Sequence, residues 1–366
     1  MTSHERNDAT LGIGGLDDVL GGGLERSRTY LLEGSPGAGK TTIALQFLMS
    51  GAAAGERCLY ITLSETEDEL RATARSHDWD LGGIEIYELV PPESLLDEEQ
   101  QQSLLYSSDL ELGETTKRIF EAFERVEPSR VVLDSLSEIR LLAQNSLRYR
   151  RQILALKHYF ARSGVTVLML DDLTSDANDK TVHSVAHGVI RLDELAPEYG
   201  GERRRLRVIK YRGRRYRGGY HDFAIETGGV HVFPRLVSAE HRTAFARDLL
   251  ATDSTEFDAL LGGGLDRGSS VLVLGPAGTG KSLLALTFVK TAVDRGESAA
   301  MFVFDEEVGL LIQRAQGLGI DLQAMIHSKR LVLEQVDAAE LSPGEFSARV
   351  RHCVEEYAPA RSWLTA

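Results

Sequence analysis

The sequence predicts an α/β fold built on a mostly parallel sheet, flanked by helices and extended by antiparallel edge strands. We expect this fold twice, with an incomplete second copy. Three observations carry the prediction: short apolar runs alternate with amphipathic helices, the pattern changes to a period of two after Val189, and motifs return 241 residues later. Alternation of strands and helices is typical of parallel sheets covered on both faces.

The elements of the first copy follow one another in a regular order. We expect strands at 30–33, 59–63, 131–134 and 165–170, and helices at 40–53, 66–76, 117–126 and 147–163. Acidic residues open the second of these helices, where they suit the positive end of the helix dipole. Alternating stretches at 189–192, 205–211 and 220–225 predict antiparallel strands at the sheet edge.

The repeat covers much more than a single motif. LDDVLGGGL at 16–24 returns as FDALLGGGL at 257–265, and the strand expected at 30–33 is matched by 272–274. The segment TLSE at 62–65 is matched by VFDE at 303–306. Lys40 and Glu65 are therefore separated by the same distance as Lys281 and Glu306. Such regular spacing predicts two related modules.

The second copy is expected to be shorter than the first. Residues 127–135 align with 358–366 at an offset of 231, so ten residues are missing in between, within the part that matches 91–109. That polar, acidic and glutamine-rich segment predicts a surface loop or a mobile lid. We expect a complete domain at 1–238 and a truncated second domain at 239–366.

Composition and charge exclude several classes of protein. The 366 residues are 42% hydrophobic and carry a net charge of −14, which disfavours a general nucleic-acid binder. Cys58 and Cys353 are isolated, so neither a disulfide framework nor a metal site is expected. The first residues are polar, and no apolar stretch approaches the roughly 20 residues that cross a bilayer. We expect a soluble, cytoplasmic protein without membrane contact.

Each copy contains the pattern G-x-x-x-x-G-K-[ST], the phosphate-binding loop of nucleotide triphosphatases. The glycines let backbone N–H groups turn toward phosphate oxygens, and the following helix adds its positive end. The lysine contacts the β- and γ-phosphates, and the hydroxyl of Thr41 or Ser282 binds Mg²⁺. The predicted nucleotide-binding residues are Gly34, Ser35, Pro36, Gly37, Ala38, Gly39, Lys40, Thr41, Thr42, Gly275, Gly278, Thr279, Gly280, Lys281, Ser282 and Leu283.

Two carboxylates complete the predicted chemistry of the first copy. Asp134 ends the apolar run RVVLD, where we expect a ligand that holds Mg²⁺ through water; the alternative is a helix-capping aspartate. Glu65 follows a strand and is placed to polarise the water that attacks the γ-phosphate; the alternative is a charge at a helix start. Glu65 has an acidic counterpart, Glu306, at the same distance from its lysine, so we assign the catalytic role to Glu65.

The run ERRRLRVIKYRGRRYR at 202–217 holds nine Lys and Arg residues and one Glu. The residues alone leave three interpretations: a solvated edge strand protected by its charge, a nucleic-acid surface, or a cationic finger that reaches the nucleotide of a neighbouring subunit. His183 and His187 lie four apart, but no third ligand is near, so we expect no zinc site. The pair at 171–172 is either a polar sensor of the γ-phosphate or a turn.

Taken together, these motifs resemble the KaiC-like branch of the RecA superfamily over nearly the whole chain. The resemblance rests on GIGGLDDVLGGGL, GSPGAGKTT, the TLSE segment, VVLDSL and the stretch from residue 203 to 233. In that family a K-x-R-G strand contacts the ATP of the adjacent subunit in a ring, and here the matching residues are Lys210, Arg212 and Gly213. The resemblance implies a RecA-like ATPase that binds ATP and Mg²⁺ between subunits, typically in hexamers.

The sequence also departs from that family. Its circadian members carry two consecutive glutamates where this chain has 64–65 and 305–306, which implies hydrolysis that is slow or that depends on Glu65 alone. Thr365 stands where the second domain would carry its magnesium aspartate. The leading hypothesis is a slow ATPase that acts as a signalling switch with protein partners. The alternatives are a serine/threonine autokinase, which we disfavour, a RecA/RadA-like DNA-dependent ATPase, and a scaffold that binds ATP without hydrolysing it.

Overall fold

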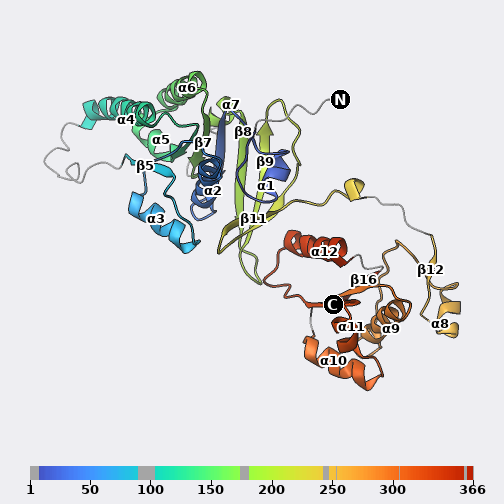
Figure 1. The fold of residues 1–366 in the computed structure, drawn as a ribbon. Coiled ribbons are helices and arrows are strands. Elements are labelled where there is room, and N and C mark those ends of the chain that lie inside the picture. Colours follow the sequence, from blue (N-terminus) through green and yellow to red (C-terminus); the bar gives the residue numbers. More distant parts are fainter. Residues whose placement is uncertain are drawn as a thin grey trace. The chain divides into compact units, whose positions relative to one another are not determined.

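A computed structural model describes residues 8–89, 104–173, 181–241, 247–252, 254–304, 306–357 and 361–365. The chain divides into two compact units (Figure 1). The first comprises Met1–Pro197 and Glu202–Arg235, and the second comprises Glu198–Gly201 and Leu236–Ala366.

A nine-stranded sheet forms the centre of the first unit. In spatial order its strands are β11 (Gly229–Phe233), β10 (His221–Glu226), β9 (Arg203–Tyr211), β8 (Gly188–Leu195), β3 (Thr29–Gly34), β7 (Thr166–Asp171), β6 (Arg130–Asp134), β4 (Cys58–Thr62) and β5 (Ile84–Glu88). Neighbours from β8 to β5 pair in parallel, whereas β9, β10 and β11 continue the sheet in antiparallel pairing. The predicted α/β fold, with antiparallel strands at the edge, is confirmed.

Helices cover both faces of this sheet (Figure 1). Tyr30 and Leu32 of β3 are buried with α2 (Lys40–Ala53) and α3 (Glu67–Ser76), whereas Leu31 is buried with α4 (Leu104–Val126), α5 (Leu136–Ala143) and α6 (Ser146–Arg162). Successive strand residues point to opposite faces, so a strand buried on both sides is apolar throughout. The smaller elements are β1 (Asp8–Ala9), α1 (Leu16–Leu20), β2 (Leu24–Glu25) and α7 (Thr181–Val185).

The segment expected to be a surface loop or lid, 91–109, is only partly described. Residues 91–103 lie outside the described residues, and the expectation is wrong for 104–109, which form the start of α4. The physical reason is a helical repeat hidden by polar composition. Leu105, Leu112 and Ile119 recur every seven residues, and Leu112 and Ile119 are buried.

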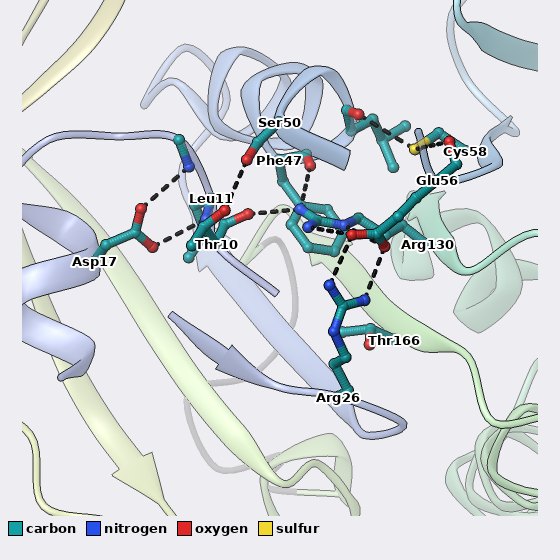
Figure 2. Close-up of polar contacts among 12 residues, drawn as sticks. Thr10, Leu11, Asp17, Arg26, Phe47, Ser50, Glu56, Cys58, Arg130 and Thr166 are labelled. Carbon is teal, nitrogen blue, oxygen red and sulfur yellow. Dashed lines mark hydrogen bonds and ion pairs between the residues drawn. The ribbon is translucent and has the colours of Figure 1, made fainter. Parts of the chain in front are cut away.

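A buried arginine fixes helix α2 to strand β6 (Figure 2). Arg130, only 1% exposed, donates to the carbonyls of Phe47 in α2, at 2.9 Å, and of Thr10, at 2.5 Å. Its guanidinium also donates to both carboxylate oxygens of Glu56, and the guanidinium of Arg26 donates to the same two oxygens. Hydrogen bonds from Arg26 and Arg130 hold the pKa of Glu56 at about 2, so the cluster is charged and paired at neutral pH.

A three-stranded parallel sheet forms the second unit, in the order β15 (Leu331–Gln335), β14 (Ala299–Val303) and β16 (Arg361–Thr365). The helices α9 (Lys281–Asp294), α10 (Val308–Gly317) and α11 (Leu322–His327) bury one face of β14. Phe302 and Cys353, the latter in α12 (Pro343–Tyr357), lie in the core on the other face. The remaining elements are the 3₁₀ helix Ser238–His241, β12 (Leu249–Leu250), α8 (Thr255–Leu260) and β13 (Leu265–Asp266).

The segment matched to strand β3 in the second unit does not form a strand. Leu272 and Leu274 are 80% and 81% exposed, and residues 271–276 have no regular secondary structure. In the first unit β3 lies between β7 and β8 and pairs with both. In the described residues of the second unit, no strand pairs with 271–274. An apolar pattern alone does not make a strand without a neighbouring strand to pair with it.

None of the helices in the described ranges combines the length and the apolar character needed to cross a membrane.

Candidate nucleotide site

The first loop, residues 34–42, joins β3 to α2 at the carboxyl end of the parallel strands. Gly37 and Gly39 have φ angles of 82° and 97°, a left-handed region that glycine adopts without strain. Gly39 caps the N-terminus of α2, which begins at Lys40. Ser35, Pro36 and Gly37 are exposed, so the tip of the loop is open to a ligand at the positive end of the helix.

The second loop, residues 275–283, has glycines in the same left-handed conformation at matching positions, although residues 271–274 directly before it form no strand. Gly278 and Gly280 have φ angles of 80° and 90°, matching the glycines of the first loop. Lys281 donates to the carbonyls of Gly275 and Pro276 at 2.7 and 3.1 Å. The loop conformation is therefore encoded locally by its glycines and does not depend on the sheet.

Lys40 is buried at the centre of the first loop and is surrounded by oxygen atoms. Its Nζ donates to the carbonyls of Gly34 and Ser35, both at 2.9 Å, and lies 2.8 Å from Oδ1 of Asp172. Asp172 directly follows β7, the strand beside β3. The two aspartates at 171–172 therefore have different partners: Asp171 pairs with Arg140 at 2.7 Å, and Asp172 pairs with Lys40 of the loop.

Asp134 lies at the end of β6, as the sequence predicts, and the residue is only 6% exposed. The hydroxyl of the fully buried Tyr60 donates to Oδ2 of Asp134 at 2.5 Å. Burial raises the pKa of Tyr60, and the nearby side chain of Thr41, the other predicted magnesium ligand, opposes this shift. Burial, reinforced by the negative charge of Asp172, raises the pKa of Asp134 to about 6.

Glu65 lies in the turn after β4, close enough to these groups to interact with their charges. Its backbone is held by Thr62, whose hydroxyl donates to the Glu65 carbonyl at 2.7 Å and accepts from the Glu65 amide at 2.9 Å. Burial raises the pKa of Glu65, and the charges of Asp134, Glu69 and Asp172 raise it further. A raised pKa makes the carboxylate a better proton acceptor.

The oxygen ligands around the first loop fit Mg²⁺. This ion prefers hard oxygen donors and is usually held by one or two carboxylates together with substrate phosphates and water. The Thr41 hydroxyl and the Asp134 carboxylate, which both lie near the Tyr60 hydroxyl, provide such a set. In the ranges that the structure describes, no group of three or more His, Cys, Asp or Glu side chains is arranged to hold a metal by itself.

Lys210 and Arg212 meet at the C-terminal end of the short helix α7. Lys210 donates to the carbonyls of His183, at 2.5 Å, and Ala186, at 2.7 Å, and Arg212 donates to the Ser184 carbonyl at 2.9 Å. Among the described residues these two cations contact α7 and not the loop of their own chain. Burial lowers the pKa of Lys210, and the nearby positive charges of Arg212 and Lys157 lower it further.

The two histidines near α7 do not form a pair. His183 Nε2 lies 2.6 Å from Oε2 of Glu33, the residue before Gly34, whereas His187 follows the helix and lies 3.3 Å from Glu25. Burial would raise the pKa of Glu33, but His183 and Arg191 outweigh this effect and lower it. The histidines are therefore partners of two different carboxylates.

Comparison with known proteins decides the family. A family model described as "ATPase: KaiC" matches residues 9–237 and 250–361. The chain belongs to the KaiC ATPase family. Its KaiC-like relatives include circadian clock protein KaiC3 of a Synechocystis strain, 31% identical over 86% of this chain and 63% of the relative. KaiC2 of the same strain is 28% identical over 93% of this chain and 59% of its own length. The chain thus spans about three fifths of the length of these KaiC relatives.

Several residues of this KaiC-like site carried no signal in the sequence. Tyr60 stands in an apolar strand and looks like an ordinary core residue. Lys157, which donates to the Val185 carbonyl at 2.8 Å, stands in an amphipathic helix among other cations. The sequence marks Asp172 as the second of two aspartates at the end of a strand, but it does not indicate the contact of Asp172 with Lys40. Each of these contacts joins residues far apart in the chain.

Proposed function

We propose that the chain is an ATPase whose working site lies in residues 1–238 and hydrolyses Mg-ATP slowly. The observation that carries this proposal is the gathering of Lys40, Asp134 and Asp172 at the end of the parallel strands, where Lys40 pairs with Asp172 and its charge acts on Asp134. Membership of the KaiC ATPase family supports it. In this site, backbone N–H groups of residues 34–42 bind the phosphates, and Lys40 balances their charge.

Thr41 and Asp134 are the residues that would hold Mg²⁺, which neutralises charge on the phosphates when bound. Tyr60 orients the Asp134 carboxylate, because its hydroxyl donates to Oδ2 of that side chain. Glu65 orients the attacking water and accepts its proton. The raised pKa of Glu65 suits this role, and the anchoring of its backbone by Thr62 fixes the point from which the side chain extends.

We further propose that Lys210 and Arg212 act on the nucleotide of a neighbouring copy in a ring, which we expect to be a hexamer. Burial lowers the pKa of Lys210, and the positive charges of Arg212 and Lys157 lower it further; a phosphate group from outside would relieve this repulsion. The K-x-R-G pattern and the family resemblance support the same role. A nucleic-acid role is less favoured, because Arg204 is paired with Glu194 at 2.8 Å and Arg205 lies 3.9 Å from Asp193.

For residues 239–366 we propose weak or regulatory nucleotide binding through Gly275, Lys281 and Ser282. The loop conformation supports binding, but Glu306 is paired with Arg314 at 2.7 Å and is less available as a base. The ATPase would then serve as a slow switch in which nucleotide state sets ring geometry for signalling partners. We infer a cytoplasmic protein.

Phosphate release under saturating Mg-ATP tests the catalytic assignment. Glu65→Gln is expected to lower the rate by about 10²- to 10⁴-fold, as for loss of a general base. Glu306→Gln, the matched change in the second unit, is expected to leave it unchanged. Equal background rates for wild type and Glu65→Gln would instead indicate a scaffold that binds ATP without turnover, and transfer of labelled γ-phosphate to the protein would indicate an autokinase.

Mass measurement in solution tests the ring. We expect assembly beyond a dimer with Mg-ATP, weakened by Arg212→Ala and unaffected by Lys117→Ala, an exposed cation on α4. A strict monomer in saturating Mg-ATP would remove the role assigned to Lys210 and Arg212.

A further inference from the structure

The ammonium group of Lys40 has no donor left for a phosphate. A lysine has three N–H donors. Its Nζ lies within hydrogen-bond distance of three oxygens: the carbonyls of Gly34 and Ser35 at 2.9 Å and Asp172 Oδ1 at 2.8 Å. A phosphate oxygen that binds Lys40 must therefore displace one of these partners.

Asp172 is the partner that a phosphate can replace. The two carbonyl contacts belong to the loop itself, because Lys281 makes the same pair of contacts in the second loop. Asp172 comes from a different strand, and its side chain is 29% exposed, compared with 7% for that of Lys40. A phosphate oxygen and a carboxylate oxygen are both anionic acceptors, so each satisfies the same donor.

The attachment of Asp172 allows its side chain to leave while its backbone stays. The Asp172 amide donates to the Ser137 hydroxyl at 3.3 Å, and the preceding Asp171 is tied to Arg140 and Ser137. These contacts hold the end of β7 against α5. Release of Lys40 therefore requires only rotation of the Asp172 side chain, not movement of the strand.

We propose that Asp172 competes with the nucleotide phosphates for Lys40 and thereby weakens nucleotide binding and promotes product release. This inference rests on the proposed Mg-ATP site. Nucleotide binding must break the pair with Lys40 and leave a carboxylate beside the phosphates. The apparent affinity is the intrinsic affinity multiplied by the fraction of molecules in which Lys40 is not paired with Asp172. When the product leaves, Asp172 returns to Lys40 and opposes rebinding.

Nucleotide affinities measured by calorimetry with the full chain and Mg²⁺ test this role. In Asp172→Asn the Kd for Mg-ATP is expected to fall about tenfold, equivalent to about 1.4 kcal/mol. The Kd for Mg-ADP should fall less, because one phosphate fewer meets the removed charge, and that for AMP should not change. Asp172→Glu keeps the charge and should keep the weaker binding. Asp193→Asn removes a carboxylate with a similar exposed fraction, 27%, and should change nothing.

The outcomes separate this inference from the function on which it rests. Unchanged or weaker ATP binding in Asp172→Asn would overturn the competing role, and would indicate that Asp172 supports the nucleotide. An equal effect on ATP, ADP and AMP would also overturn it, since a general structural change does not depend on phosphate number. If wild type bound no Mg-ATP, the proposed function itself would be wrong, and the inference with it. A thermal-shift series supplies a second readout: the rise in melting temperature on adding Mg-ATP should be larger in Asp172→Asn than in wild type.

Discussion

Replacing Asp134 with asparagine is expected to stabilise the first unit while it removes a proposed magnesium ligand. The carboxylate is buried, and its pKa is raised from the ordinary value of 3.8 to about 6. A raised pKa means that the folded protein disfavours the charged form. Asparagine has nearly the same shape, carries no charge, and can still accept the hydrogen bond from Tyr60.

The size of the effect follows from the shift. A difference of about two pKa units corresponds to about 3 kcal/mol at about 1.36 kcal/mol per unit. Because the pKa is higher in the folded state, the folded protein binds more protons, so stability is greatest at low pH and is lost as pH rises through about 6. The asparagine variant should therefore be more stable than wild type by about 3 kcal/mol at pH 8, and by about half as much at pH 5.

Urea denaturation read out by hydrogen exchange in peptides of β6 measures this difference in the first unit alone. Glu56→Gln is a control of opposite sign. Hydrogen bonds from Arg26 and Arg130 lower the pKa of Glu56 to about 2, so the folded protein favours its charged form, and this variant should be less stable than wild type at pH 8. An Asp134→Asn variant that is less stable than wild type at pH 8, or a difference that does not change with pH, would refute the reasoning.

Two further predictions concern the framework of the first unit. Gly15 and Gly55 have φ angles of 80° and 77°, but a Cβ at Gly15 would lie 2.0 Å from the Val232 carbonyl oxygen, whereas none of the described atoms lies within 4 Å at Gly55. Gly15→Ala should therefore destabilise the unit by several kcal/mol and Gly55→Ala by about 1–2 kcal/mol, measured by urea denaturation. Arg130→Met should destabilise the unit by about 3–5 kcal/mol, because it leaves the buried groups that bind Arg130 without a partner. Arg57→Met, in an exposed ion pair, should cost at most about 1 kcal/mol. Similar losses for Arg130 and Arg57 would contradict the importance of burial.

The parts of the fold that depend on residues close together in the chain could be predicted from the sequence. The parallel strands of the first unit are continuous apolar runs, and the loop glycines at 37, 39, 278 and 280 dictate their own conformation. The carboxylate at the end of β6 could be placed because it directly follows such a run. These features depend on residues close together in the chain, which is why pattern and spacing reveal them.

Features that depend on distant residues could not be predicted. The contacts of Lys40 with Asp172 and of Tyr60 with Asp134 join different strands of the sheet, and single-chain spacing does not fix them. Residues 272–274 have the pattern of a strand, but a strand needs neighbours, and among the described residues of the second unit none pairs with this segment. The start of α4 was missed because polar and glutamine-rich composition concealed a seven-residue repeat.

Mg-ATP binding by three forms of the full chain tests the central claim most directly: wild type, Lys40→Ala and Lys281→Ala, compared by equilibrium dialysis. If the first loop is the working site, wild type binds, Lys40→Ala loses most of the bound nucleotide, and Lys281→Ala keeps it. Full binding and turnover in Lys40→Ala, or loss only in Lys281→Ala, would contradict the assignment of the site to the first unit.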